Sequence, residues 1–352
     1  MVLESRAPSC EANRSRDAGG IILGIESTAH TFSIGWVDGL GVPGKSVSAF
    51  VRPIKGGIHP REAADHHAKH AGAILQELLD KEVQLSEVKA IAFSQGPGLG
   101  PCLRIGASVA RSLAIQLNVP LVGVNHCVAH IEVGRERCDC DDPVLLYASG
   151  GNTQVIARLD GKYRVLGETL DIGIGNMLDK FAREQGIPFP GGPKIESLAL
   201  EWLHDNPNPS LEGLELPYAV QGMDLAFSGV LNAALNLVEN GVPLPAVCWS
   251  LQEHTFAACV EVAERAMAHA GKDELLLGGG VACNERLRSM CQIMATSRDS
   301  TSHVPEKFLC IDNGSMIATL GRLQLLWGCE TALDESGVRQ DLRTDETPIL
   351  WN

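Results

Sequence analysis

Two histidines four residues apart are the first side chains in this sequence whose type and spacing could bind a metal ion. His126 and His130 are separated by Cys-Val-Ala. On a helix, residues four apart lie on one face, so both imidazoles could share one ion. The pair follows the apolar run Leu121 to Val124 and so lies at the carboxyl end of a predicted strand, where α/β proteins gather ligands. Spacing alone leaves a metal site and an incidental pair equally open.

A second pair with the same spacing occurs earlier in the chain. His66 and His70 lie within a longer helical pattern that runs to Asp80, which favours a partly solvated helix face. Neither pair contains the glutamate of the HExxH motif. A metalloprotease built on either pair would therefore lack its usual general base.

One carboxylate could complete a site with the histidines. Asp312 occurs in the segment Cys-Ile-Asp-Asn-Gly, just before a helix predicted over residues 313–327. An aspartate in that position is more typical of a helix N-cap than of a metal ligand. The sequence pattern alone therefore favours the cap.

Glycine-rich turns after apolar strands are the second chemical feature. Ser149-Gly150-Gly151-Asn152-Thr153 follows one apolar run, and Gly278–Gly280 follows another and precedes Asn284 and a predicted helix. Such turns expose backbone N–H groups that can hold phosphate oxygens, and the helix N-terminus adds further N–H groups. Each turn alone is also compatible with a plain tight turn. Together they favour nucleotide binding, and because they match neither Walker A nor GxGxxG, they argue against P-loop and Rossmann sites.

Two acidic side chains lie in segments of the kind that line ligand clefts. Glu196 follows Pro-Gly-Gly-Pro-Lys and is predicted to lie in the first turn of a helix, where an acidic residue is favourable on its own account. Asp179 is predicted to lie on a helix and could equally be a surface charge.

The elements around these residues are typical of a largely parallel α/β sheet. Residues 21–25 and 32–37 predict a hairpin, and strand 90–93, helix 105–117 and strand 120–124 form a βαβ unit. After an acidic loop at 138–143, the hairpin opening recurs at 144–148 and 155–157. This weak duplication indicates two similar halves that could hold one ligand. The remaining expectations are a loop at 206–217, a helix at 251–270, a strand at 274–277 and a peripheral tail after Glu330.

Composition narrows the class of protein. A chain of 352 residues is long enough for two domains. No apolar run reaches membrane-spanning length, and the first twenty residues lack the apolar core of a secretory signal. The 11 cysteines are scattered along the chain and contain no CxxC motif, a pattern that favours reduced thiols and hence the cytosol. The Cys138/Cys140 pair in the acidic loop is interpreted as incidental rather than as a metal site. A net charge of −14 is unlike that of a protein that binds nucleic acid alone.

Nine segments in this order resemble the family of Kae1, TsaD and Qri7 proteins, once called O-sialoglycoprotein endopeptidases. The resemblance covers residues 21–327. The segments are ILGIESTAH (22–30), GIHPREAA (57–64), GPGLG (96–100), VNHCVAHIE (124–132), YASGGNT (147–153), FPGGPK (189–194), FSG (227–229), GGVACN (279–284) and CIDNG (310–314). The form NHCxxHIE, with Tyr147 before Ser-Gly-Gly, is more similar to the archaeal and eukaryotic cytosolic branch than to the bacterial one.

The resemblance implies the ASKHA fold of actin-like ATPases: an α/β protein of two related lobes with a nucleotide cleft between them. We therefore expect a flexible extension over residues 1–20, an N-terminal lobe over 21–143, a C-terminal lobe over 144–330 and a charged tail over 331–352. The last helix of the C-terminal lobe could pack on the first lobe.

The family also implies a set of site residues. It implies one divalent ion, iron or zinc, bound by His126, His130 and Asp312, with Tyr147 as a further ligand in this branch. The cleft would hold ATP or threonylcarbamoyl-adenylate. The residues expected to contact that ligand are Tyr147, Ala148, Ser149, Gly150, Gly151, Asp179, Gly192, Glu196 and Asn284.

The implied activity is transfer of the threonylcarbamoyl group from its adenylate to N6 of adenosine 37 in tRNA, with release of AMP. His59, His30 and Glu26 lie in motifs near the expected cleft, but none is assigned as the general base. The implied partners are tRNA and the KEOPS subunits, namely a small atypical kinase, a dimerising subunit and a kinase regulator, in the cytoplasm and without a membrane. The alternatives are a nucleotide-binding regulatory ATPase without transfer activity and a glycoprotein metalloprotease.

Overall fold

The structure, a computed structural model, describes residues 18–51 and 59–351. The expected flexible extension over residues 1–20 lies almost entirely outside this range, as do the first two residues of the 57–64 motif. The chain divides into two compact units: unit 1 comprises residues up to Glu136 together with Asp312–Asn352, and unit 2 comprises Arg137–Ile311.

Unit 1 is built on a five-stranded mixed sheet in the order β3-β2-β1-β4-β5. Its strands are β1 (Ile21–Glu26), β2 (Thr31–Val37), β3 (Val47–Phe50), β4 (Val88–Gly96) and β5 (Leu121–Asn125). The first three strands are antiparallel neighbours, while β4 runs parallel to β1 and β5 runs parallel to β4. The predicted hairpin and βαβ unit are therefore both confirmed.

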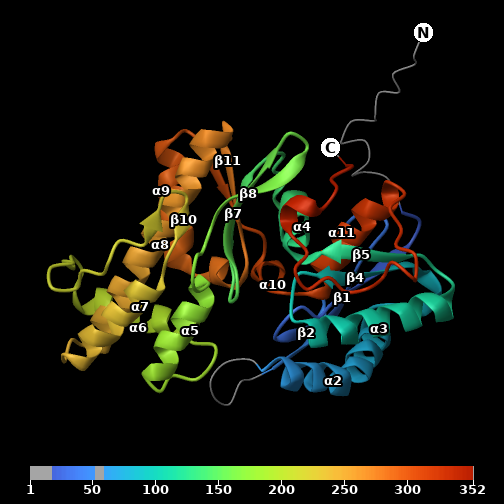
Figure 1. The fold of residues 1–352 in the computed structure, drawn as a ribbon, viewed down its shortest axis with the longest axis horizontal. Coiled ribbons are helices and arrows are strands. Elements are labelled where there is room, and N and C mark those ends of the chain that lie inside the picture. The colour runs from blue at the N-terminus through green and yellow to red at the C-terminus, as the bar shows by residue number, and fades with distance from the viewer. Residues whose placement is uncertain (1–17, 52–58, 352) are drawn as a thin grey trace, which may run out of the picture. The chain divides into compact units, whose positions relative to one another are not determined.

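The two faces of this sheet are covered by different helices, as Figure 1 shows. The helices of unit 1 are α2 (Pro60–Lys81), α3 (Gly100–Leu117), α4 (His126–Cys138) and α11 (Gly314–Leu326). Leu23 and Ile25 of β1 share a core with residues of α2 and α3. Successive strand residues point to opposite faces, so Gly24 between them faces α11 instead. The central strand is thus buried on both sides.

Unit 2 repeats the same sheet pattern. Its five-stranded sheet has the order β12-β11-β6-β7-β8. It contains β6 (Val144–Ala148), β7 (Thr153–Leu159), β8 (Lys162–Glu168), β11 (Glu274–Gly278) and β12 (Thr301–His303). The first three strands are again antiparallel, and β11 and β12 again add in parallel at the other edge. The internal duplication predicted from the hairpin openings is therefore confirmed at the level of topology.

Helices and short elements complete unit 2. The α-helices are α5 (Ile174–Glu184), α6 (Gly192–Asp205), α7 (Ser228–Glu239), α8 (Leu244–Ala270), α9 (Glu285–Ser297) and α10 (Lys307–Cys310). The short elements are the two-stranded ladder of β9 (Val220–Gln221) and β10 (Asp224–Leu225), and the 3₁₀ turn η2 (Gly280–Cys283). Helix α8 is buried along most of its length and forms much of the core of this unit. None of the helices within 18–51 and 59–351 is both long and apolar enough to cross a membrane.

The domain division agrees with one expectation and differs from another. Helix α11 packs on β1, β2 and β4 of unit 1, as was considered for the last helix, whereas the division after Glu136 falls within α4 rather than after residue 143. The tail beyond Glu330 is not peripheral, so that expectation was wrong. Thr331 N–H donates to the Leu121 carbonyl at 2.8 Å, Arg339 N–H donates to the Gln95 carbonyl at 2.8 Å, and Trp351 is only 1% exposed.

Three glycines allow α11 to approach the first hairpin at backbone distance. A Cβ on Gly24 would lie 2.1 Å from the Gly314 carbonyl oxygen, and a Cβ on Gly314 would lie 2.1 Å from the Gly35 nitrogen. The Gly314 N–H donates to Ser33 Oγ at 3.0 Å, which attaches the first residue of α11 to β2. The position of Asp312, two residues earlier, follows from this contact.

We predict that Gly24→Ala destabilises the protein by about 1–3 kcal/mol, because the added methyl group overlaps backbone atoms of α11 that cannot move aside. The matched control is Gly72→Ala on the exposed face of α2, where a Cβ meets no atom within 4 Å. That control should stabilise the helix by about 0.5–1 kcal/mol. Thermal unfolding of both variants checks the prediction, and equal melting temperatures would contradict the close packing.

Candidate active site

The three predicted metal ligands come together within unit 1. His126 is the first residue of α4 and directly follows β5, His130 lies one turn later, and Asp312 directly precedes the N-cap of α11. Asp312 Oδ1 lies 3.5 Å from His126 Nε2 and 3.4 Å from His130 Nε2. In the part of the chain that the structure describes, no other group of three His, Cys, Asp or Glu side chains converges in this way.

The spacing of these atoms fits a shared ion better than direct hydrogen bonds. Donor atoms about 2.1 Å from a tetrahedrally coordinated ion lie roughly 3.4 Å from one another. A charge-assisted hydrogen bond between an imidazole and a carboxylate would instead be about 2.7–2.9 Å long. The observed separations of 3.4 and 3.5 Å therefore match the geometry of a metal site.

The N-cap interpretation of Asp312 is wrong. The side chain of Asn313, the next residue, accepts a hydrogen bond from Met316 N–H at 2.9 Å and so caps α11. Asp312 therefore stands one position outside the helix, and its carboxylate faces the two histidines. The sequence correctly predicted a capped helix start at this point, but the capping residue is Asn313 and not Asp312.

A buried glutamate orients the first histidine. Glu26, the last residue of β1, is fully buried, and its Oε2 lies 2.9 Å from His126 Nδ1. Its other oxygen accepts hydrogen bonds from the backbone N–H and the hydroxyl of Thr28, at 2.6 and 2.5 Å. A proton on Nδ1 leaves Nε2 as the ligand atom, which is the usual carboxylate–histidine–metal arrangement. The sequence placed Glu26 only near the expected cleft, and its position at the end of a central strand was the available signal.

The electrostatics of the cluster favour a cation. Burial lowers the pKa of His126, but the charges of Glu26 and Asp312 and the hydrogen bond to Glu26 raise it overall to about 9. Burial would raise the pKa of Asp312, yet the charge of His126, the polar contact with His130 and the charge of His30 hold it well below its usual range. The cluster thus holds one buried and one partly buried carboxylate, Glu26 and Asp312, which a bound cation would stabilise.

The rival pair on α2 lacks these features. His70 Nδ1 bonds to the backbone carbonyl of His66 at 2.8 Å, and the two rings contact each other at a tilt of 34°, with centroids 4.1 Å apart. Both side chains are partly exposed, as expected for a solvated helix face. His67 between them is buried and contacts the Ala29 carbonyl at 3.1 Å through Nε2.

The expected nucleotide contacts lie in unit 2, beginning with the turn that joins β6 to β7. Gly175 N–H donates to the Ser149 carbonyl at 3.1 Å, and Asn176 N–H donates to the Gly150 carbonyl at 3.0 Å. The first turn of α5 therefore packs directly on the glycine turn. A Cβ on Gly151 would meet no atom within 4 Å, so the outer side of the turn is open.

The acidic residues link this turn to the neighbouring helices. Asp179 on α5 accepts a hydrogen bond from Gly191 N–H at 2.7 Å, just before Gly192 begins α6. Glu196 is the fifth residue of α6, beyond the first turn in which it was expected, and it accepts from Glu285 N–H at 2.7 Å. Asp179 is half-buried, so it is not simply a surface charge.

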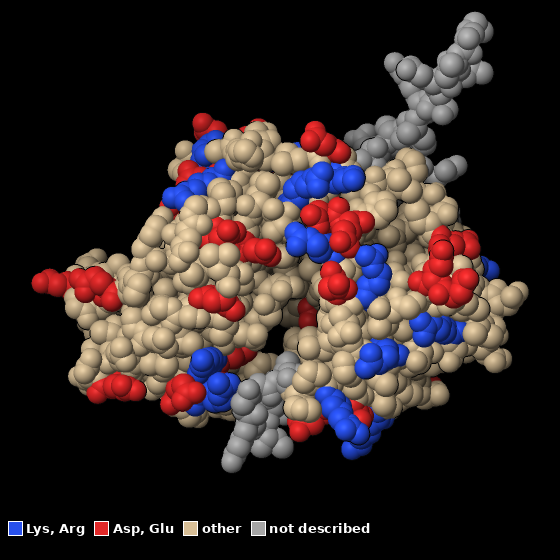
Figure 2. Space-filling model, in the orientation of Figure 1, with Lys and Arg blue, Asp and Glu red and all other residues tan. Residues whose placement is uncertain are grey.

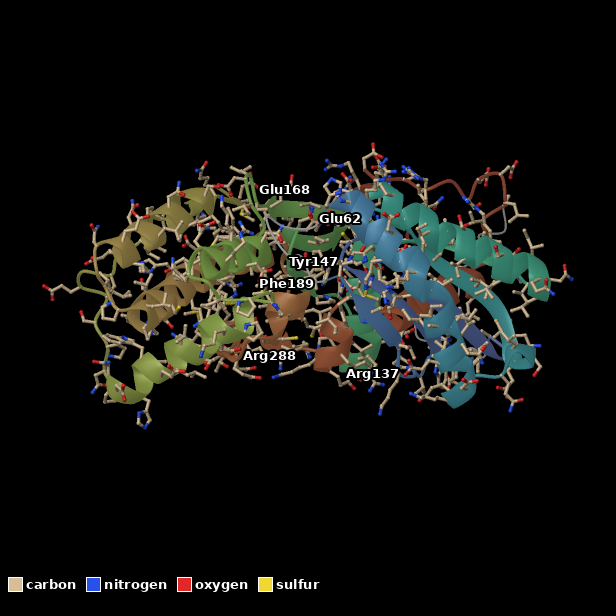
Figure 3. All side chains as sticks on the ribbon, turned by 90° about the horizontal axis from the view of Figure 1, so that it is seen from below. Glu62, Arg137, Tyr147, Glu168, Phe189 and Arg288 are labelled. Carbon is tan, nitrogen blue, oxygen red and sulfur yellow. The ribbon has the colours of Figure 1, made fainter. Side chains whose placement is uncertain are left out.

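Asn284 and Tyr147 complete the set. The side chain of Asn284 caps α9 by accepting from the N–H groups of Arg286 and Leu287, and it donates to Gln252 Oε1 at 2.7 Å. Tyr147, labelled in Figure 3, lies in β6 between Gln154 and Gly278 and is 2% exposed. It is followed by Ala148, which is fully buried. Unit 2 thus contains all the expected nucleotide contacts, and hydrogen bonds connect the glycine turn to α5, Asp179 to the start of α6 and Glu196 to the start of α9.

Comparison with known proteins decides the family. Residues 46–319 match the family model described as TsaD, tRNA N6-adenosine threonylcarbamoyltransferase. A protein of that description from Thermococcus kodakarensis is 51% identical over 94% of this chain and 100% of its own length. The chain belongs to the TsaD family.

Other relatives are longer. A probable bifunctional tRNA threonylcarbamoyladenosine biosynthesis protein from Methanoculleus marisnigri is 51% identical over 94% of this chain. The match covers 60% of that protein, so the chain spans about three fifths of the length of the bifunctional relatives.

Solved structures show the fold. HypF from T. kodakarensis has a TM-score of 0.59 at 16% identity, over 88% of this chain and 48% of that one. The activator of 2-hydroxyisocaproyl-CoA dehydratase from Clostridium difficile, with bound ADPNP, has a TM-score of 0.53 at 9% identity, over 88% and 96%. These likenesses and the duplicated sheets confirm the predicted ASKHA fold.

We predict that His126→Ala abolishes retention of a divalent metal while the fold stays intact, because the variant removes one ligand and the partner of Glu26. The matched control is His70→Ala, which removes a histidine of the same i,i+4 spacing outside the cluster. Elemental analysis after gel filtration, with circular dichroism for folding, provides the measurement. Full metal occupancy in folded His126→Ala would remove this histidine from the site.

We also predict that Glu26→Gln lowers metal affinity by about 10–100-fold, because the amide orients His126 less strongly and carries no charge. Glu82→Gln at an exposed position of unit 1 is the control and should leave affinity unchanged. Competition with a chromogenic chelator measures both variants. Equal affinities would show that Glu26 does not act on the site through His126.

Proposed function

We propose that this chain transfers the threonylcarbamoyl group from threonylcarbamoyl-adenylate to N6 of adenosine 37 in tRNAs that read codons starting with A, with release of AMP. The observation that carries the proposal is the convergence of His126, His130 and Asp312 in a chain of the TsaD family. The relatives named for this activity are about half identical over 94% of the chain.

The metal centre is proposed to be one iron or zinc ion held by His126, His130 and Asp312, with Tyr147 as a further ligand. Imidazole, carboxylate and phenolate donors suit either metal. When bound, the ion supplies charge stabilisation at a phosphate or carbamoyl oxygen. Glu26 keeps the proton of His126 on Nδ1, and Asp312 keeps its negative charge because of the surrounding histidines.

The adenylate is proposed to bind the open glycine turn of unit 2. The N–H groups of residues 149–151 suit phosphate oxygens, since the turn is open at Gly151, where a Cβ would meet no atom within 4 Å. The carboxylates of Asp179 and Glu196 suit ribose hydroxyls, which are hydrogen-bond donors. The N-terminus of α6 at Gly192 and that of α9 at Asn284 add further polar groups around the same ligand.

The nucleophile belongs to the tRNA in this scheme. The N6 amine of adenosine 37 attacks the carbamoyl carbon, the bond to the phosphate oxygen breaks, AMP leaves with the electron pair, and one N6 proton is released to solvent. No serine or cysteine nucleophile of the protein is needed. The contribution of the protein is to hold the two substrates in position and to stabilise charge on the leaving group.

Partner subunits are proposed to supply much of the surface that holds tRNA. The chain carries a net charge of −14, and on the face shown in Figure 2 acidic and basic side chains are interspersed. Nucleic-acid surfaces are usually far more positive. We therefore propose that the chain acts in the cytoplasm within a KEOPS assembly of a small atypical kinase, a dimerising subunit and a kinase regulator.

We predict that threonylcarbamoyl-adenosine forms only when this chain is present in a reconstituted reaction. The reaction contains unmodified tRNA, threonine, bicarbonate, ATP, an adenylate-forming enzyme and the partner subunits. Nucleoside mass spectrometry of the digested tRNA detects the product. His126→Ala should lose the product, and His70→Ala should keep it.

A reaction that yields no modified nucleoside, with partners shown to be competent using another family member, would reject the transferase. ATP turnover that is independent of tRNA would then favour a regulatory ATPase.

A further inference from the structure

The C-terminal tail, residues 331–351, is attached to the two strands of unit 1 that lead into α3 and α4, and it is part of the red segment in Figure 1. At β5, Gly123 N–H donates to Thr331 Oγ1 at 2.8 Å. At the end of β4, Gln95 Nε2 donates to the Glu335 carbonyl at 3.1 Å. Together with the backbone bonds described above, these contacts make the tail a packed part of unit 1.

One route from the tail to the proposed metal site passes through Asn125, which directly precedes His126. Asn125 is buried, and its Oδ1 accepts hydrogen bonds from the N–H groups of Cys127 and Val128 at 2.9 and 3.2 Å. This is an N-cap, and it fixes the first turn of α4. Since the oxygen faces two donors, the amide nitrogen faces the other way, and Nδ2 donates to the Arg343 carbonyl at 3.1 Å. One side chain thus ties the start of α4 to the tail.

A second route passes through the glycine-rich loop between β4 and α3. A Cβ on Gly96 would lie 1.8 Å from the Arg339 carbonyl oxygen, so this glycine admits the tail at backbone distance. Gly98 N–H donates to the Gln340 carbonyl at 3.1 Å. Gly98 also lies against the turn that follows β1, where its Cβ would be 2.7 Å from the Thr28 carbonyl oxygen. The loop is therefore held between the tail and that turn.

The turn after β1 carries the contact onward to the histidine. Leu99 N–H of the glycine-rich loop donates to the Thr28 carbonyl at 2.7 Å. Thr28 donates to Glu26 from its own N–H and hydroxyl, and Glu26 Oε2 lies 2.9 Å from His126 Nδ1. The two routes therefore meet at His126, one through the cap of its helix and one through the carboxylate that orients its ring.

We propose that the tail is a positioning segment for the metal centre and that Asn125 is the positioning residue through which it acts most directly. This inference rests on the proposed function, because the ion that His126 would ligate belongs to that proposal. The cap holds the backbone of His126 and Glu26 holds its ring, so that Nε2 stays beside Asp312. A ligand that is already in place loses less conformational freedom when the ion binds, and the affinity is correspondingly higher.

Substitutions at Asn125 separate the helix cap from the bond to the tail. Asn125→Ser keeps a hydroxyl oxygen that suits an N-cap but removes the amide N–H that donates to Arg343. Asn125→Ala removes both. We expect Asn125→Ser to weaken Zn²⁺ binding about 10-fold relative to the wild type, and Asn125→Ala to weaken it further. Competition with a chromogenic chelator on the full chain measures the affinities, and Asn240→Ser, at an exposed position after α7, is the matched control.

The absorption spectrum of bound Co²⁺ distinguishes a positioning role from a general loss of stability. The visible band of Co²⁺ depends on the geometry of its ligands, so Asn125→Ser should change the band of the Co²⁺-loaded protein. The melting temperature of the metal-free protein should fall by about 2–4 °C at most, the effect of one lost hydrogen bond. Wild-type Zn²⁺ affinity and a wild-type Co²⁺ band in folded Asn125→Ser would overturn the proposal.

A second variant displaces the tail through the other route. Gly96→Ala places a methyl group on the Arg339 carbonyl, so hydrogen exchange in residues 331–351 should increase and Zn²⁺ affinity should fall. Faster exchange of the tail together with wild-type Zn²⁺ affinity would show that the tail does not act on the ligands and would overturn its role. A wild type that binds no divalent ion would instead reject the metal centre itself. Failure of the transferase assay would affect none of these measurements.

Discussion

The contact between the start of α11 and the first hairpin is the constraint on which the cluster of His126, His130 and Asp312 depends. Gly24, Gly35 and Gly314 let the backbones meet where any side chain would overlap, and the Gly314 N–H bonds to Ser33 of β2. Asp312 is thereby fixed beside two histidines that precede it by more than 180 residues. The parallel pairing of β5 with β4, and of β4 with β1, places His126 and Glu26 at the same end of the sheet. The proposed ligands thus come from α4 and from the start of α11, and β1 adds the orienting Glu26, all aligned by a single sheet.

The repeated topology gives each unit its own part of the chemistry. In both units three consecutive strands form an antiparallel meander. Two further strands then add in parallel beside the first strand of that meander, which is β1 in unit 1 and β6 in unit 2. In unit 1 the carboxyl ends of the strands carry Glu26 and His126, and in unit 2 they carry the glycine turn after β6 and the η2 turn after β11. These are the positions at which α/β sheets bind ligands. The duplication therefore provides two similar edges, one with the converging side chains of the proposed metal site and one with open backbone.

Local patterns in the sequence predicted the residues that act through local geometry. The i,i+4 histidines, the glycine turns and the hairpin openings depend on spacing of a few residues, and the structure has them as expected. The role of Glu26 depends on the pairing of β1 with β4, which no local spacing shows. The cap of α11 was misplaced by one residue because Asp312 and Asn313 both suit that position, and only the fold distinguishes them. The packed tail was missed for a similar reason, since its backbone hydrogen bonds to β4 and β5 involve residues far earlier in the chain.

The most direct test of the central claim is a crystal structure with anomalous diffraction measured at the absorption edges of iron and zinc. The account predicts one anomalous peak in unit 1, roughly 2.0–2.2 Å from His126 Nε2, His130 Nε2 and an oxygen of Asp312. It also predicts that Glu26 remains bonded to His126 Nδ1 in that structure. A metal-replete crystal with no peak at this cluster, or with its peak between His66 and His70, would contradict the account.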